Sequence, residues 1–246
     1  MSDFDIDKAA ADLLAARRDR RPISVRSPGP ASFDEAFRVQ DAVARTLGPT
    51  GAWKVGRAPT GELTAAPIAV PLVRPSPCTW PASDLLRIGI EAEIAFRLGR
   101  QLRGGESENE IREAIAAVHA VIEVVDSRFD TWPVPDPLWA LADNQNNGGL
   151  VYDPAGTAWS GQSLERAQVD ITVGGGSIFS QEGANPGGDP FALLVALVAH
   201  TAGRGGLKAG DLVTTGSLNG IAFVEPGASV AVAVAGIGRV SLDLPN

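Results

Sequence analysis

The fold is decided by the stretch Ile88-Gly89-Ile90-Glu91-Ala92-Glu93-Ile94-Ala95-Phe96-Arg97-Leu98. Every even-numbered position holds an apolar side chain, and the odd-numbered positions hold mainly polar or small residues. This alternation predicts a β-strand over residues 88–98. Side chains two positions apart lie on the same face of a strand. Glu91 and Glu93 therefore share one face, and the apolar side chains share the other.

A third glutamate lies inside the apolar stretch Val121-Ile122-Glu123-Val124-Val125. A carboxylate in such a stretch is costly to bury unless it is paired or coordinated. Hard divalent cations such as Mg²⁺ bind carboxylate oxygens and would relieve the repulsion between Glu91 and Glu93. The residues alone leave an alternative open, in which Glu91 and Glu93 form a solvated acidic face and Glu123 points outward.

The surrounding sequence predicts many short strands and few helices, which favours an α+β fold with a folded-over sheet or barrel. We expect a helical segment over residues 1–50 and one β-rich, metal-binding unit over residues 51–246. Both faces of the strand at residues 229–235 look buried, since Val and Ala alternate there. We predict helices over residues 6–18, 32–48, 108–117 and 189–203, with Ser32 and Asp189 as the N-caps of the second and the fourth. Further strands are predicted over residues 120–127, 169–173, 212–215 and 240–244. Loops are predicted over residues 74–81 and 131–149.

Composition excludes several classes of function. The net charge of −8 argues against extended contact with nucleic acid or anionic membranes, which require clustered Lys and Arg. Cys78 is the single cysteine, so an internal disulfide or a cysteine-rich zinc site cannot form. The N-terminal residues contain no apolar signal region, and no stretch of about 18 apolar residues occurs. We therefore expect a cytoplasmic protein.

Several other polar residues are candidates for the site. Lys54 lies between aromatic and aliphatic residues and could act as an electrophile, a base or a carboxylate anchor, although the residues alone favour a lysine at a strand edge. Asp126 and Arg128 could form a structural salt bridge. Asp143 and Asn144 lie in the predicted loop at residues 131–149, where such side chains often bond to the local backbone.

Six segments, taken in order, resemble the fumarylacetoacetate hydrolase superfamily, in particular its branch of 2-hydroxypenta-2,4-dienoate hydratases and 4-oxalocrotonate decarboxylases. The resemblance covers nearly the whole chain. The segments are Phe37-Arg38-Val39-Gln40, Trp53-Lys54-Val55-Gly56, Gly89 to Phe96, Ile122 to Arg128, Ala142-Asp143-Asn144, and Leu207 to Ser217.

The resemblance implies a mixed β-roll or barrel with peripheral helices and a homo-oligomeric assembly. It implies Mg²⁺ or Mn²⁺ bound by Glu91, Glu93 and Glu123, with Lys54 close to the substrate. The substrates of the family are small 2-oxo or 2-enol acids. By the same resemblance we expect Asp143 to be catalytic with Lys54, and Asn144 and Ser217 to bind substrate.

This chain departs from the hydratase pattern at three places. The stretch between Lys54 and Glu91 is shorter and lacks a clear counterpart for an acidic residue. Gln145 follows Asp143-Asn144 where hydratases tend to have serine. Arg57 follows Lys-Val-Gly where a smaller or apolar residue is usual, and its forked guanidinium could bind a second carboxylate of the substrate.

The reaction that we expect is hydration of a 2-hydroxydienoate to a 4-hydroxy-2-oxo acid. A metal ion on the C2 oxygen would stabilise the enolate-like charge that develops during this reaction. Decarboxylation and hydrolytic C–C cleavage on the same scaffold are alternatives. A non-catalytic subunit that supports an active relative is a third.

Overall fold

The computed structural model describes residues 4–246, so residues 1–3 of the predicted helical segment lie outside the described residues. The helices are α1 (Ile6–Asp19), α2 (Phe33–Leu47), α3 (Glu108–Ala114), α4 (Pro137–Ala142) and α5 (Pro190–Thr201). Short 3₁₀ helices cover Val70–Leu72, Ala82–Asp84, Asn144–Asn146 and Ala202–Arg204. The strands are β1 (Thr50–Arg57), β2 (Leu63–Ala69), β3 (Val73–Pro75), β4 (Cys78–Thr79), β5 (Gly89–Leu98), β6 (Ile115–Val125), β7 (Asn147–Tyr152), β8 (Arg166–Val173), β9 (Gly176–Ala184), β10 (Leu212–Thr214), β11 (Ala222–Phe223), β12 (Ser229–Val234) and β13 (Gly238–Asp243).

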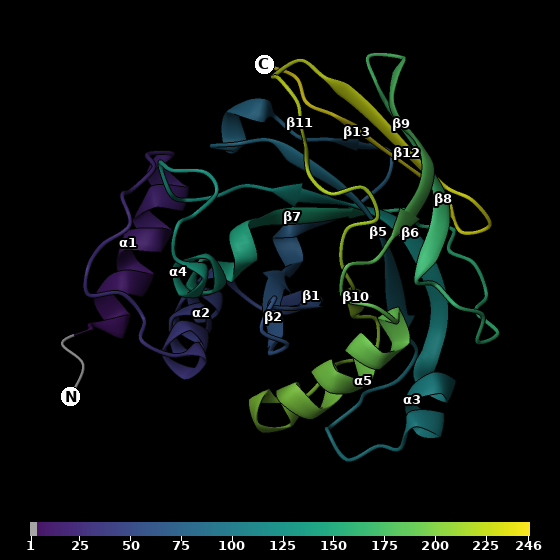
Figure 1. Ribbon diagram of the computed structural model, residues 1–246, viewed down its shortest axis with the longest axis horizontal. Coiled ribbons are helices and arrows are strands. Elements are labelled where there is room, and N and C mark those ends of the chain that lie inside the picture. Colours follow the sequence, from purple (N-terminus) through teal and green to yellow (C-terminus); the bar gives the residue numbers. More distant parts are fainter. Residues whose placement is uncertain (1–3) are drawn as a thin grey trace.

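The larger of two sheets has the strand order β2-β1-β10-β5-β6-β7-β3, and β11 pairs with β5. Its central hydrogen-bonded pair is the long antiparallel pair β5 and β6. Strand β10 comes from the C-terminal third of the chain and inserts between β1, to which it is parallel, and β5, to which it is antiparallel. Strands from distant parts of the sequence therefore lie side by side in one curled sheet (Figure 1).

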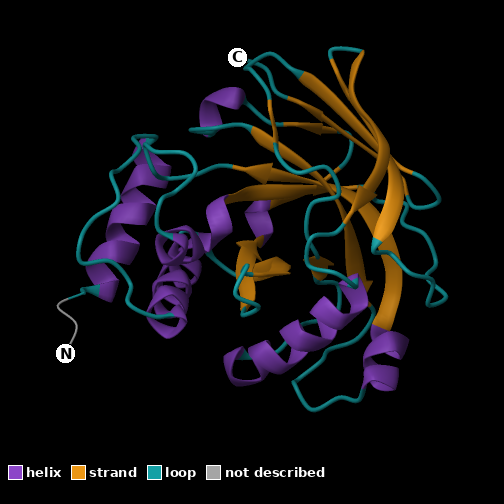
Figure 2. Cartoon of the chain, viewed as in Figure 1, coloured by secondary structure: helices purple, strands orange, loops and turns teal. Residues whose placement is uncertain are grey.

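The second sheet has the order β4-β13-β12-β8-β9 and packs against the larger one (Figure 2). The main hydrophobic core lies between the two sheets and includes Ile90, Ile94, Ile122, Ile171 and Val232. Helix α5 closes one side of this core through apolar residues such as Leu194 and Leu197. The apolar face of β5 is thus buried in the core, and its glutamate face points to the other side of the larger sheet.

Helices α1, α2 and α4 form a separate hydrophobic cluster beside the larger sheet, centred on Leu13, Val39, Phe129 and Trp139. Ser32 caps α2 by accepting a hydrogen bond from the backbone N–H of Glu35 (3.2 Å), as its position before the apolar pattern predicts. The division into segments at residue 50 stays a prediction, because α4 lies far along the chain and shares this cluster.

The predicted α+β class with a curled, barrel-like sheet is confirmed. The strand at residues 88–98 is confirmed as β5 within one residue, and Asp189 caps α5 as predicted. The helix predicted over residues 108–117 was wrong at its end: it stops at Ala114, and residues 115–125 form β6. Pairing of Ile115 with Leu98 of β5 outweighs the local helical preference.

Three further predictions were wrong. The expected loop at residues 131–149 contains α4 and the start of β7, and the expected loop at residues 74–81 contains β4 and the end of β3. Only the valine face of β12 is buried, because Ala231 lies on the outer face of the second sheet and is exposed.

In the described part of the chain, no helix is long and apolar enough to span a membrane.

Candidate metal centre

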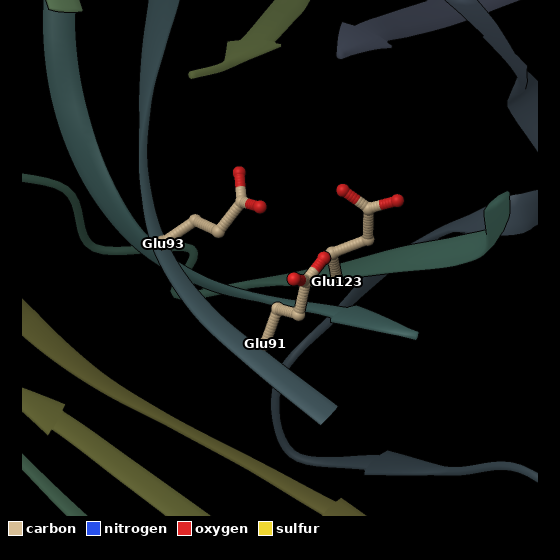
Figure 3. Close-up of side chains that lie close together, drawn as sticks. All are labelled: Glu91, Glu93 and Glu123. Atoms are coloured by element: carbon tan, nitrogen blue, oxygen red, sulfur yellow. The ribbon is translucent and has the colours of Figure 1, made fainter. Parts of the chain in front are cut away.

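Glu91, Glu93 and Glu123 come together on the face of the larger sheet that is turned away from the main core. Glu91 lies directly opposite Glu123 in the antiparallel pairing of β5 with β6, and Glu93 is two residues further along β5. One carboxylate oxygen from each residue lies within 4.8 Å of the other two. Figure 3 shows the three side chains extending into the same space. The predicted alignment of Glu91 with Glu93 is therefore confirmed.

Two of the three glutamates are fully enclosed by protein and Glu91 is half-buried, which contradicts the alternative of a solvated acidic face with Glu123 pointing outward. Glu93 is 1% exposed and Glu123 is 0% exposed. Thr214 Oγ1 and the backbone N–H of Gly216 (2.9 Å) both donate hydrogen bonds to Glu93 Oε2. Strand β10 and the residues that directly follow it thus hold the Glu93 carboxylate in place.

Glu123 is fixed by two donors on one of its oxygens. Lys54 Nζ lies 2.5 Å from Glu123 Oε1, and Asn147 Nδ2 donates to the same atom at 2.9 Å. The other oxygen, Oε2, is buried and has no hydrogen-bond partner among residues 4–246. A buried carboxylate oxygen without a partner carries a desolvation cost that a bound cation would remove.

Burial perturbs the ionisation of this cluster. It raises the pKa of Glu91 to about 7, with Lys54 opposing the shift and Glu123 adding to it. Burial, followed by the charges of Glu123 and Glu91, raises the pKa of Glu93 to about 8. Burial acts to lower the pKa of Lys54, but the three carboxylates outweigh it, and that pKa lies above its ordinary value. Three oxygen-donor residues with a deficit of positive charge fit a hard divalent cation.

A cavity of about 420 Å³, here called the polar cavity, opens onto the cluster and is lined by Lys54, Arg57, Glu91, Glu93 and Ser217, among others. Arg57 is exposed, and its Nη1 donates to Gly61 O at 3.1 Å. Ser217 Oγ donates to Gly220 O at 2.8 Å within its own turn. A larger groove of about 510 Å³ runs along α1 and α2 and contains none of the three glutamates.

Asp143 and Asn144 lie outside the lining of the polar cavity. Asp143 is buried against Arg128, whose Nε is 2.5 Å from Asp143 Oδ1 and whose backbone N–H donates to Oδ2 at 2.9 Å. Arg128 also pairs with Asp126 at 3.5 Å, so the suggested structural salt bridge is present. Asn144 Nδ2 donates to Pro67 O at 3.3 Å. The catalytic role of Asp143 and the substrate contact of Asn144 stay predictions.

Gln145 is a site residue for which the sequence suggested no role. It lines the polar cavity, its carbonyl oxygen accepts a hydrogen bond from Lys54 Nζ at 3.3 Å, and its Nε2 is buried with no partner among the described residues. Its backbone is left-handed (φ 53°), as are those of Asn144 and Asn146. Such strain in residues other than glycine is concentrated at functional sites. The run of four amides at residues 144–147 was the available signal.

Residues 38–244 match the family described as "Fumarylacetoacetate (FAA) hydrolase C-terminal". The 2-keto-4-pentenoate hydratase of Paraburkholderia xenovorans (strain LB400) is 30% identical over 171 residues, which cover 68% of this chain and 63% of that relative's length. The 2-keto-4-pentenoate hydratase 2 of Dechloromonas aromatica (strain RCB) is 29% identical over 263 residues, which cover 96% of this chain and 95% of the relative.

Solved structures show the same fold. The 4-oxalocrotonate decarboxylase from Pseudomonas putida G7, complexed with magnesium and adipate, superimposes with a TM-score of 0.85 over 97% of each chain at 24% identity. A fumarylpyruvate hydrolase from Pseudomonas aeruginosa, in complex with Mn²⁺ and pyruvate, gives a TM-score of 0.57 at 17% identity and covers 79% of this chain and 88% of that one. With the family match spanning most of the sequence, the chain belongs to the fumarylacetoacetate hydrolase family.

Proposed function

We propose that this protein is a divalent-metal-dependent lyase that hydrates a 2-hydroxydienoate to a 4-hydroxy-2-oxo acid. The observation that carries the proposal is the cluster of Glu91, Glu93 and Glu123, with the Lys54 ammonium beside it. Within the described part of the chain, Oε2 of Glu123 is buried and has no partner. The three carboxylates would hold Mg²⁺ or Mn²⁺. Relatives named as hydratases support the choice of reaction.

A divalent ion at this position would polarise the C1 carboxylate and C2 oxygen of the substrate. Lys54 Nζ would donate a hydrogen bond to the C2 oxygen as negative charge grows there. The reaction adds one water in two steps. The C2 enol gives up its proton and C5 gains one, so the double bonds shift to C2=O and C3=C4. Water then adds its hydroxyl group to C4 and its remaining proton to C3. Gln145, whose Nε2 has no partner among residues 4–246, would help to hold the anionic end of the substrate.

Incubation with 2-hydroxypenta-2,4-dienoate and Mg²⁺ tests the proposal. We expect loss of the dienol absorbance and appearance of 4-hydroxy-2-oxopentanoate by NMR, both abolished by a chelator. A panel of 2-oxo acids in the same buffer would detect decarboxylation, which the fold shared with a decarboxylase makes the second candidate. No turnover of any acid with Mg²⁺ or Mn²⁺ would favour a non-catalytic subunit.

Two further expectations stay predictions. Homo-oligomeric assembly is implied by the family resemblance, and light scattering of the purified protein would test it. A cytoplasmic location rests on the sequence alone.

A further inference from the structure

A second cavity, of about 310 Å³, adjoins the polar cavity and is here called the apolar cavity. The two share Lys54, Thr64, Glu91 and Gln145 as lining residues. Lys54 and Glu91 also belong to the candidate metal centre. A molecule held at the glutamates can therefore extend in either of two directions.

The two directions differ in chemistry. Residues that line only the apolar cavity include Pro59, Val125, Trp132, Leu141 and Ile221, and Asn146 is the one polar side chain among them in the described chain. Residues that line only the polar cavity include Arg57, Asn185 and Ser217. Burial of hydrocarbon in the first environment is favourable, whereas a carboxylate there would lose its hydration. No described residue that lines only the apolar cavity carries a positive charge to compensate that loss.

Exposed apolar side chains lie on and beside the wall of the apolar cavity. Ile221 and Phe223 are 39% and 49% exposed, which is unusual for large apolar residues in the described chain. The Phe223 ring meets that of Trp132 edge to face, with centroids 5.6 Å apart, and the Arg87 guanidinium lies 5.7 Å from the Trp132 ring centroid. These contacts hold Trp132 in place as one wall of the cavity.

We propose that the substrate carries an uncharged hydrocarbon tail, held in the apolar cavity between Trp132 and Ile221 while its 2-oxo acid end lies at the glutamates. This inference rests on the proposed function and specifies its substrate class. It opposes the alternative in which Arg57 binds a second carboxylate. Arg57 lines the polar cavity and already donates to Gly61 O in its own hairpin.

Calorimetry of the Mg²⁺-loaded protein with unreactive 2-oxo acids tests the inference without turnover. We expect affinity to rise about fourfold per methylene from 2-oxobutanoate to 2-oxohexanoate. 2-Oxohexanoate should bind more tightly than 2-oxohexanedioate, which has the same carbon chain and a second carboxylate.

Substitutions test whether the gain in affinity per methylene comes from the apolar cavity. Trp132→Ala should reduce the gain per methylene to less than about twofold. Ile221→Ala should reduce the gain per methylene partly. Because Ile221 is exposed, this substitution should leave folding intact. Ile178→Ala is the matched control, since Ile178 is an exposed isoleucine (50%) on β9 outside both cavities.

The outcomes distinguish failure of the apolar tail from failure of the proposed function. Affinities that are equal along the series, or equal losses in the Ile221→Ala and Ile178→Ala variants, would overturn the apolar tail and leave the proposed function standing. Tighter binding of 2-oxohexanedioate, lost in Arg57→Lys, would overturn it in favour of Arg57. No Mg²⁺-dependent binding of any 2-oxo acid would overturn the proposed function together with this inference.

Discussion

Lys54 Nζ lies 2.5 Å from Oε1 of Glu123, although the two residues are 69 positions apart in the sequence. The contact forms because β1, β10, β5 and β6 lie side by side in one sheet, in which Lys54 pairs with Thr214 of β10. Lys54 supplies one positive charge against three carboxylates. The site is therefore arranged to attract a further cation and to keep an ammonium group beside it.

Metal binding should depend on each glutamate. Glu91→Gln or Glu123→Gln removes one charged ligand, so we expect Mg²⁺ affinity to fall by at least about 100-fold, more than for loss of an outer-shell partner. Calorimetry with Mg²⁺ and Mn²⁺ measures it. Glu165→Gln, at an exposed glutamate, is the control. Unchanged affinity in both site variants would return these residues to a purely structural role.

Stabilisation by Mg²⁺ should grow with pH. The pKa values of Glu91 and Glu93 are raised from an ordinary 4.5 to about 7 and about 8. The protonated carboxyl groups therefore add to the unfolding free energy of the metal-free protein. This contribution is complete below pH 4.5 and is lost as the pH rises through about 7 to 8. A bound cation favours the ionised forms. Thermal unfolding should show a larger Mg²⁺-induced rise in Tm at pH 8 than at pH 6, and an equal rise at both would contradict this.

Lys54 should act mainly on the transition state. Lys54→Met keeps the side-chain length and removes the charge, so kcat should fall by about 10²–10³. Mg²⁺ affinity should not fall, because the lost ammonium repelled the ion. Lys208→Met, at an exposed lysine, serves as control. A raised KM with intact kcat would mean that Lys54 only anchors the substrate.

Gln145 should contribute to binding of the anionic substrate. Gln145→Met removes the buried, unpartnered Nε2 donor, and hydrogen bonds to charged groups contribute about 1.5–3 kcal/mol. We expect affinity for 2-oxobutanoate to fall by about tenfold or more, with no loss of stability. Gln181→Met, on the exposed surface of β9, controls for the substitution itself. Equal affinity in both variants would exclude this contact.

The ion pair of Arg128 with Asp143 should contribute mainly to the free energy of unfolding. Both are buried, and removing one partner of such a pair costs about 3–5 kcal/mol, so Asp143→Asn should lower the unfolding free energy strongly. Breaking the exposed Arg166–Glu182 pair should cost less than about 1 kcal/mol. If Asp143→Asn keeps its stability under urea denaturation but loses turnover, Asp143 is catalytic, as the family resemblance implies.

The sequence by itself determined the local features of this protein. Alternation along residues 88–98 was enough to place Glu91 and Glu93 on one face of a strand, and Ser32 and Asp189 marked the starts of two helices. These features depend on neighbours in the chain, so a local pattern suffices. Asp136 followed by Pro137 was a comparable signal for α4, which was missed inside a presumed loop.

Tertiary structure alone decided which of these local features meet. The register that sets Glu91 opposite Glu123, and the insertion of β10 that brings Thr214 to Glu93, follow from long-range strand pairing. Long-range pairing also ended the predicted helix at Ala114. Both cavities combine distant segments, as Pro59, Trp132 and Ile221 show. Their chemistry depends on packing across the whole fold, and no pattern of neighbouring residues encodes it.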